Sequence, residues 1–192
     1  MNRKGLPTNK LVQIAVIGAL YTVLTFVSGS FAFGTVQFRL SEVLTLLPLF
    51  SPVSIWGLVF GCFFSNVIGF VTGLNPIGLI DAVVGTSATL LAALVTYAIG
   101  RLPDQKRLLK YIFAPLPPVV FNGIIVGLEL TFVFSGEFIW GAFWGNALSV
   151  VIGEAVVCYV LGLIMVGVLY RNDFYKKFCG RWNNMCHSAG YY

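Results

Sequence analysis

The basic residues of this chain avoid its long apolar runs almost completely. Eleven of the twelve Lys and Arg residues fall in three clusters outside those runs, and only Arg39 lies within apolar sequence. The runs are about 20 residues long, which is the length that crosses a ~30 Å hydrocarbon core as a helix. Charged residues make up 10% of the chain, against roughly a quarter in soluble domains. The sequence therefore predicts an integral membrane protein.

The apolar runs predict an all-α membrane protein, a bundle of six transmembrane helices. They lack the alternating pattern of an outer-membrane barrel. We expect spans at about 10–28, 34–50, 53–72, 78–100, 115–134 and 138–170, the last long enough to include a segment lying at the interface. The second span is weaker than the others and ends at Pro48 and Pro52. One six-helix transmembrane domain is expected over 1–175, followed by a cytoplasmic tail at 176–192.

The three basic clusters predict the orientation of the bundle. They comprise Arg3, Lys4 and Lys10, then Arg101, Lys106, Arg107 and Lys110, and finally Arg171, Lys176, Lys177 and Arg181. With six spans all three clusters share one face, and short cytoplasmic loops are the ones that collect Lys and Arg. Both termini and the 101–110 loop are therefore expected in the cytoplasm. Topology accounts for the net charge of +5, which gives no indication of nucleic-acid binding.

The residues needed for enzyme chemistry are not found together. His187, the single histidine, lies in the tail, so no Ser–His or Cys–His pair can form within the membrane. Its spacing from Cys179 and Cys186 fits no zinc motif, and we expect neither a metal nor a cofactor. The chain also contains no G-x-x-x-x-G-K-[ST] sequence to hold a nucleotide phosphate. If ATP drives transport, the ATPase is expected in separate subunits.

Polar residues inside the spans mark the candidate site. A charge at mid-membrane costs roughly 2.5–3.5 kcal/mol on insertion scales, so each such residue requires a partner or a role. With the predicted orientation, all of them except Asn122 lie at mid-depth or toward the outside, which is typical of a pocket loaded from the external side. The residues are Arg39, Glu42, Asn66, Asp81, Asn122, Glu129, Asn146 and Glu154.

Purely structural roles are also open to these residues. Arg39 and Glu42, three residues apart, can pair along one helix face and serve packing alone. Asp81 at a helix N-terminus is favoured by the helix dipole. Glu129 can extend to the outer interface, and the asparagines can join helices. Glu154 is the hardest to explain without a ligand or a proton, because no cation is near it in the sequence.

Small residues indicate where helices approach one another or a partner. The first span carries Ala15 and Ala19 with Gly18 and Thr22, a smooth stripe suited either to packing within the bundle or to docking onto another subunit. The third span carries small residues at every fourth position, namely Gly57, Gly61, Ser65 and Gly69.

Three separated motifs resemble the QueT family. They are Val36-Gln37-Phe38-Arg39-Leu40-Ser41-Glu42 running on to Leu47-Pro48, Ala114-Pro115-Leu116-Pro117-Pro118 through Phe121-Asn122-Gly123, and Ile152-Gly153-Glu154-Ala155-Val156. The resemblance covers roughly residues 11–169. It implies a substrate-binding S component of an energy-coupling factor (ECF) transporter in a prokaryotic cell membrane, which takes up a queuosine precursor such as preQ1, preQ0 or queuine. The implied partners are a transmembrane coupling subunit, docked at Ala15 and Ala19, and two ATPase subunits.

The chemistry of a 7-deazaguanine suggests roles for the polar residues. Its N1–H and N2–H donors suit one carboxylate, Glu42 or Glu154, and its acceptors suit Arg39 or Asn146. A primary amine, as in preQ1, would require another acid such as Asp81 or Glu129. Phe38 or Trp144 can cover the face of the ring, although most aromatic residues near the outer surface are expected to form an interfacial belt.

Other functions remain open from the sequence. An S component for a different, vitamin-like ligand would have a similar sequence pattern. A stand-alone secondary transporter could use Glu154 as a proton carrier, although the two halves of the chain show no convincing repeat. A membrane enzyme or a purely structural subunit is the remaining alternative.

Overall fold

The computed structural model describes residues 7–33, 37–103 and 107–171, and these residues form helices and connecting turns without a strand. Five of the helical stretches are long and apolar enough to cross a membrane: Thr8–Val27, Val53–Val71, Gly78–Gly100, Leu108–Ser135 and Trp140–Arg171. The prediction of an all-helical protein with several membrane spans is confirmed. The basic residues Arg3, Lys4, Lys106, Lys176, Lys177 and Arg181, and the tail at 176–192 with Cys179, Cys186 and His187, lie outside the described residues.

The helices begin and end close to most of the predicted boundaries. They are α1 (Thr8–Val27), α2 (Val53–Val71), α3 (Gly78–Gly100), α4 (Arg107–Phe113), α5 (Leu116–Ser135), α6 (Trp140–Ala155) and α7 (Leu163–Arg171). A π-helical segment, η4 (Val156–Gly162), joins α6 to α7, so the last predicted span is one interrupted helix. A short 3-10 helix, η1 (Gly29–Ala32), follows α1.

The predicted second span at 34–50 does not form a membrane-crossing α-helix. Only a 3-10 helix, η2 (Leu40–Leu49), is present, and its ten residues extend about 20 Å at the 3-10 rise of ~2.0 Å per residue. That length is well short of a ~30 Å hydrocarbon core. Arg39 precedes the helix in an extended conformation, and Pro48 inside it cannot donate a backbone hydrogen bond. The predicted count of six spans is therefore not confirmed, and the orientation of the termini stays a prediction.

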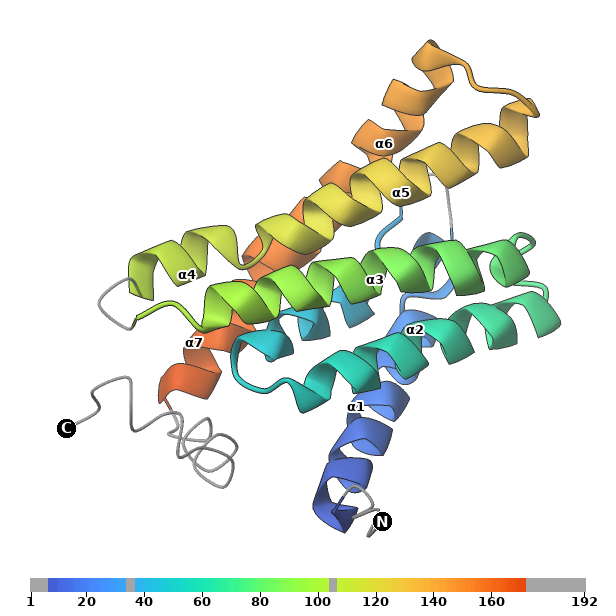
Figure 1. Cartoon of the computed structure of the whole chain (residues 1–192). Coiled ribbons are helices and arrows are strands. Elements are labelled where there is room, and N and C mark those ends of the chain that lie inside the picture. Colours follow the sequence, from blue (N-terminus) through green and yellow to red (C-terminus); the bar gives the residue numbers. More distant parts are fainter. Residues whose placement is uncertain (1–6, 34–36, 104–106, 172–192) are drawn as a thin grey trace, which may run out of the picture.

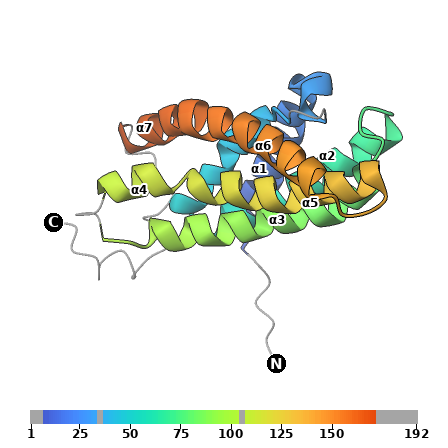
Figure 2. The ribbon, with the colours of Figure 1, turned by 90° about the horizontal axis from the view of Figure 1, so that it is seen from above.

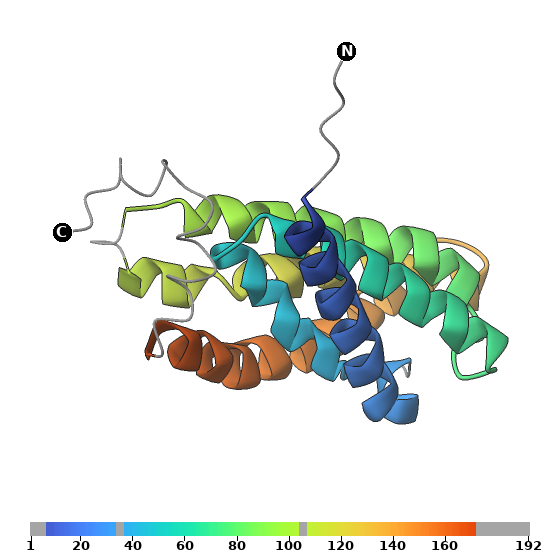
Figure 3. The same cartoon turned by 90° about the horizontal axis from the view of Figure 1, so that it is seen from below.

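The long helices pack as an antiparallel layer with α1 and η2 against it. Figure 1 shows α2, α3 and α5 side by side, with α6 continuing into η4 and α7 beyond α5. The view from above places α6 and α7 on the opposite side of α5 from α3. From below, α1 lies across α2 (Figure 3). The short η2 contacts α1, α3 and η4, so it lies inside the bundle, at the meeting point of these helices.

Glycines bring two pairs of helices into close contact. On α2, a Cβ atom at Gly57 would lie 2.7 Å from the Ile17 side chain, and one at Gly61 would lie 2.7 Å from Cβ of Tyr21. On α5, a Cβ at Gly127 would lie 2.7 Å from Cα of Ala147. The small residues on the third predicted span therefore do mark a close helix contact, here with α1.

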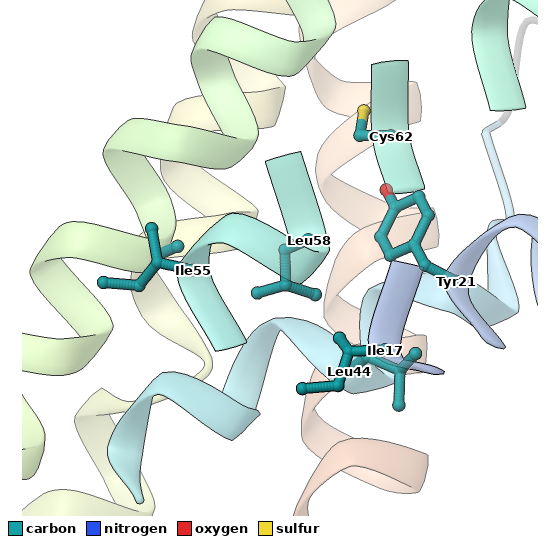
Figure 4. Close-up of a cluster of buried hydrophobic side chains, with 7 residues drawn as sticks. Ile17, Tyr21, Leu44, Ile55, Leu58 and Cys62 are labelled. Carbon is teal, nitrogen blue, oxygen red and sulfur yellow. The ribbon is translucent and has the colours of Figure 1, made fainter. Parts of the chain in front are cut away.

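A buried hydrophobic cluster ties α1, η2, α2 and α3 together. Its members are Ile17, Tyr21, Leu44, Ile55, Leu58, Cys62 and Ala93. Figure 4 shows that the Tyr21 ring extends from α1 with its hydroxyl toward Cys62 of α2. This cluster positions the Tyr21 hydroxyl at the edge of the apolar core, beside the polar residues of η2.

Candidate functional site

A cluster of buried polar side chains lies where η2, α3, α5 and α6 meet. It contains Arg39, Asp81 and the glutamates Glu42, Glu129 and Glu154, none of which is more than 6% exposed. The residues come from four segments that are far apart in the sequence. The fold brings together all five charged residues that the sequence predicted for the site.

Arg39 binds Asp81 in a buried ion pair. Its Nη2 lies 2.5 Å from Asp81 Oδ2, and its Nε donates to the carbonyl oxygen of Ala32 at 2.7 Å. The guanidinium also lies over the ring of Phe33, 5.4 Å from the centroid. The extended backbone at Arg39 directs the side chain to α3, so the expected pairing of Arg39 with Glu42 along one helix is replaced by a pairing across the bundle.

Two asparagines hold Asp81 in place. Asn75 Nδ2 donates to Asp81 Oδ2 at 3.1 Å, and Asn66 Nδ2 donates to the Asp81 carbonyl oxygen at 3.1 Å. Oδ1 of the same carboxylate is buried and has no hydrogen-bond partner. Asp81 is thus more than a favourable charge at a helix start, since it anchors the segment before η2 and retains one oxygen for another donor.

Glu42 is held by a tyrosine of α1. The Tyr21 hydroxyl donates to Glu42 Oε1, while Oε2 of the carboxylate is buried without a partner. Thr25 of α1 donates to Ser41 Oγ at 2.8 Å, one residue before Glu42. Two hydroxyl contacts from α1 therefore fix the first turn of η2 and leave one Glu42 oxygen available.

Glu154 lies deeper, opposite an amide of α5. Asn122 Nδ2 donates to Glu154 Oε1 at 2.9 Å, and the thiol of Cys158 lies 3.7 Å from Oε2. The same thiol lies 3.7 Å from the carbonyl oxygen of Glu42. Asn122 thus joins Glu154 to α5, and the Cys158 thiol lies between Glu154 and the η2 segment that carries Glu42.

Glu129 on α5 is buried with both carboxylate oxygens unpartnered. It is 6% exposed, so it does not extend to the interface as one structural alternative supposed. Its chain neighbours Val126 and Leu130 pack with Val150 of α6 and with Ile77 before α3. A carboxylate in such surroundings requires a cation, a proton or a ligand donor.

Among the described residues, Arg39 is the cation with which all four carboxylates interact. Its guanidinium interacts electrostatically with Glu42, Glu129 and Glu154 in addition to Asp81. One guanidinium balances one carboxylate, so three acids depend on protons, on neutral hydrogen-bond donors or on a bound molecule. The cluster can therefore accept several hydrogen bonds from a polar ligand and favours a positively charged one.

Among the described residues, the other predicted site residues make no side-chain hydrogen bond to the charged side chains of this cluster. Asn146 donates from Nδ2 to Thr131 Oγ1 at 3.2 Å, which links α6 to α5. Phe38 is half-buried next to Arg39, whereas Trp144 is 63% exposed and its ring lies edge-on to Phe143. Their roles as ligand contacts stay predictions.

The proposed docking residues lie on the opposite side of α1 from the core. Ala15 and Ala19 are exposed and line a shallow apolar groove between α1 and α2. The groove is lined by Leu11, Ile14, Ala15, Gly18, Ala19, Thr22, Val23, Phe60, Phe64 and Ile68.

Three residues of the cluster were missed by the sequence reasoning. Tyr21 and Cys158 were overlooked because both are compatible with an apolar span, and Asn75 because it lies in a turn between spans. One signal was available for Tyr21, since a tyrosine in the middle of a span buries a hydroxyl that then needs an acceptor. Asn75 precedes Pro76, in a turn that nothing in the sequence placed next to Asp81.

Comparisons with known proteins agree on a transporter. The family model described as QueT transporter matches residues 11–171. The chain is similar to the queuosine precursor transporter QueT of Lactococcus lactis subsp. cremoris (strain MG1363), with 34% identity over 85 residues. The alignment covers 43% of this chain and 46% of that protein, so the chain spans about half the length of the curated relative it matches. No solved structure matches the chain.

The matched region contains every charged residue of the buried cluster, from Arg39 to Glu154. It also contains nearly the full length of all five apolar helices, which identify a multi-pass membrane protein. The family match extends over most of the sequence, and the three motifs noted above lie within it. The chain therefore belongs to the QueT transporter family.

Proposed function

We propose that this protein is the substrate-specific S component of an ECF-type importer and binds a 7-deazaguanine queuosine precursor from the external side. The observation that carries the proposal is the buried cluster, in which carboxylate oxygens without partners lie beside a guanidinium and amide groups. The similarity to a queuosine precursor transporter of Lactococcus supports the substrate class. The same side chains would provide both acceptors and donors to a guanine-like edge.

Glu42 is the first choice for the carboxylate that accepts the N1–H and N2–H donors. Its Oε2 is buried and unpartnered, whereas Glu154 already accepts a hydrogen bond from Asn122. Glu154 would then act from the deep end of the site, with Arg39 or Asn146 facing the acceptor atoms of the ligand. A carboxylate that accepts two N–H donors side by side selects the guanine edge over an adenine edge.

The partner subunits belong to the same proposal. An S component has no motor of its own, and the sequence carries no phosphate-binding loop. The coupling subunit would dock on the groove beside Ala15 and Ala19, because α1 is the least buried of the five apolar helices and presents its small residues outward. The proposed orientation keeps both chain termini in the cytoplasm, with η2 as a short second segment.

Isothermal titration calorimetry on the purified protein in detergent tests the substrate class. We expect preQ1, preQ0 or queuine to bind tightly and with favourable enthalpy, and guanine to bind less well. Glu42→Gln and Glu154→Gln should each weaken binding by about tenfold to a hundredfold, since a hydrogen bond to a charged group contributes about 1.5–3 kcal/mol. Glu137→Gln is the matched control, because Glu137 is exposed in the α5–α6 loop.

Three results would redirect the proposal. Wild-type affinity in both glutamine variants would exclude this cluster as the binding site, and the lack of binding by any deazaguanine would favour a different, vitamin-like ligand. Uptake by vesicles that contain this chain alone would favour a proton-coupled secondary transporter. The observation that favours a proton-coupled transporter is the set of buried carboxylate oxygens without a partner, since such groups can carry protons.

A further inference from the structure

The four buried carboxylates differ in how many of their oxygens already have a partner. Glu154 accepts hydrogen bonds at both oxygens, from an amide and a thiol. Glu42 and Asp81 each use one oxygen and leave the other unpartnered. Glu129 uses neither. The unpartnered acceptors are therefore concentrated on Glu129, with a single additional oxygen on each of two neighbours.

Glu129 and Asp81 lie at the same end of the bundle. Asp81 is in the first turn of α3, and Glu129 lies about two turns before the end of α5, which packs antiparallel to α3. The two carboxylates interact electrostatically, and both interact with Arg39. Arg39 is already committed to Asp81 Oδ2 and to the Ala32 carbonyl oxygen, so it does not supply Glu129 with a hydrogen bond.

Three oxygens at this end of the bundle are thus buried and without a donor: Oε1 and Oε2 of Glu129 and Oδ1 of Asp81. An ammonium group carries three N–H donors and one positive charge. It would meet the hydrogen-bonding need of these oxygens and would add the second cation to a cluster that has four carboxylates and one guanidinium. A neutral hydroxyl or amide group would donate fewer hydrogen bonds and would add no positive charge.

We propose that Glu129, with Asp81 Oδ1, forms a subsite for an ammonium group carried by the transported molecule. The inference rests on the proposed function and deepens it, because it selects among queuosine precursors those with a charged amine on the substituent at position 7. The ring would lie toward Glu42 and Glu154, and the amine would lie toward α5 and the outer end of α3. Glu129 is then the residue that determines specificity for the charged substituent.

Two ligands with the same ring separate this subsite from the rest of the pocket. The 7-aminomethyl compound preQ1 carries an ammonium, and the 7-cyano compound preQ0 does not. Calorimetry is expected to show that wild type binds preQ1 at least tenfold more tightly than preQ0. Glu129→Gln should lose at least tenfold in affinity for preQ1 and change less than about threefold for preQ0. Glu129→Asp, which keeps the charge, should retain a preference for preQ1.

The experiment distinguishes failure of the ammonium subsite from failure of the proposed function. If Glu129→Gln weakens both ligands equally, or neither, the ammonium subsite is excluded while the proposed function stands. If wild type binds both deazaguanines with equal affinity, the subsite is excluded even where the glutamine variant does not fold. If wild type binds neither preQ1 nor preQ0, both the proposed function and the ammonium subsite are excluded. Glu137→Gln again controls for the loss of a carboxylate elsewhere in the chain.

Discussion

Arg39, which directly precedes η2, connects this segment to α3. Its guanidinium reaches Asp81 on α3, and both side chains are almost completely buried. Removing one partner of a buried ion pair takes away the hydrogen-bonded counter-charge of the other, at a cost of about 3–5 kcal/mol. We therefore expect Asp81→Asn to lower the free energy of unfolding in detergent by about that amount, measured as a loss of thermal stability by circular dichroism.

A double variant distinguishes the ion pair from other effects of the substitution. Arg39→Met combined with Asp81→Asn removes the stranded guanidinium, so it should unfold at a higher temperature than Asp81→Asn alone. Equal unfolding temperatures for the single and the double variant would show that the guanidinium left without Asp81 does not destabilise the fold. Ligand binding is not the readout here, because both residues lie in the proposed site.

The charged members of the site could be predicted from the sequence, but their partners could not. A charged residue inside an apolar run is visible without any structure, because burial makes it costly. The expected pairing of Arg39 with Glu42 assumed a regular helix that begins before residue 39. Since the helix begins at Leu40, Arg39 is extended and its side chain points to a residue 42 positions further along the chain.

At the scale of elements, the contact between α5 and α6 depends on Gly127. A Cβ atom there would lie 2.7 Å from Cα and 3.0 Å from N of Ala147, so the two backbones have no room for a methyl group. Overpacking of this kind costs about 1–3 kcal/mol. We expect Gly127→Ala to lower the unfolding temperature, followed by circular dichroism in detergent.

Gly145 on α6 offers the matched control. A Cβ atom there meets nothing within 4 Å, and replacing glycine by alanine inside a helix otherwise favours the helix by roughly 0.5–1 kcal/mol. Gly145→Ala should therefore leave the unfolding temperature unchanged or raise it. If both variants behave alike, the close approach at Gly127 is not a determinant of stability.

Five of the six predicted spans correspond to long apolar helices, because hydropathy and length are sufficient to find a lipid-crossing helix. The same reasoning predicted a span for the segment at 34–50, which does not form a membrane-crossing α-helix. It is apolar enough to suggest a span, but Ser41, Glu42 and Thr45 are buried against other helices and Pro48 interrupts the backbone bonding. Hydropathy measures whether a segment avoids water, and it does not distinguish burial in lipid from burial in protein.

At the scale of the whole molecule, α1 has two faces with different proposed roles. One side carries Tyr21 and Thr25, which bond to Glu42 and Ser41 in the buried cluster. The other side exposes Ala15 and Ala19 in the groove shared with α2. A single helix therefore joins the proposed ligand site to the proposed docking surface, which is the arrangement that a subunit needs if ligand binding is to affect its hold on a partner.

Tryptophan at the groove tests that docking surface without disturbing the interior. Ala15→Trp and Ala19→Trp fill the groove, so we expect each to reduce co-purification with the proposed coupling subunit and ATPases severalfold or more. Binding of the ligand to the isolated protein should stay within about threefold of wild type, because neither side chain faces the cluster.

Leu148→Trp, on an exposed position of α6, is the matched control and should affect neither complex formation nor ligand binding. Intact complexes in both the Ala15→Trp and the Ala19→Trp variant would place the docking surface elsewhere on the bundle, whereas loss of ligand binding would show that α1 had been displaced from Glu42.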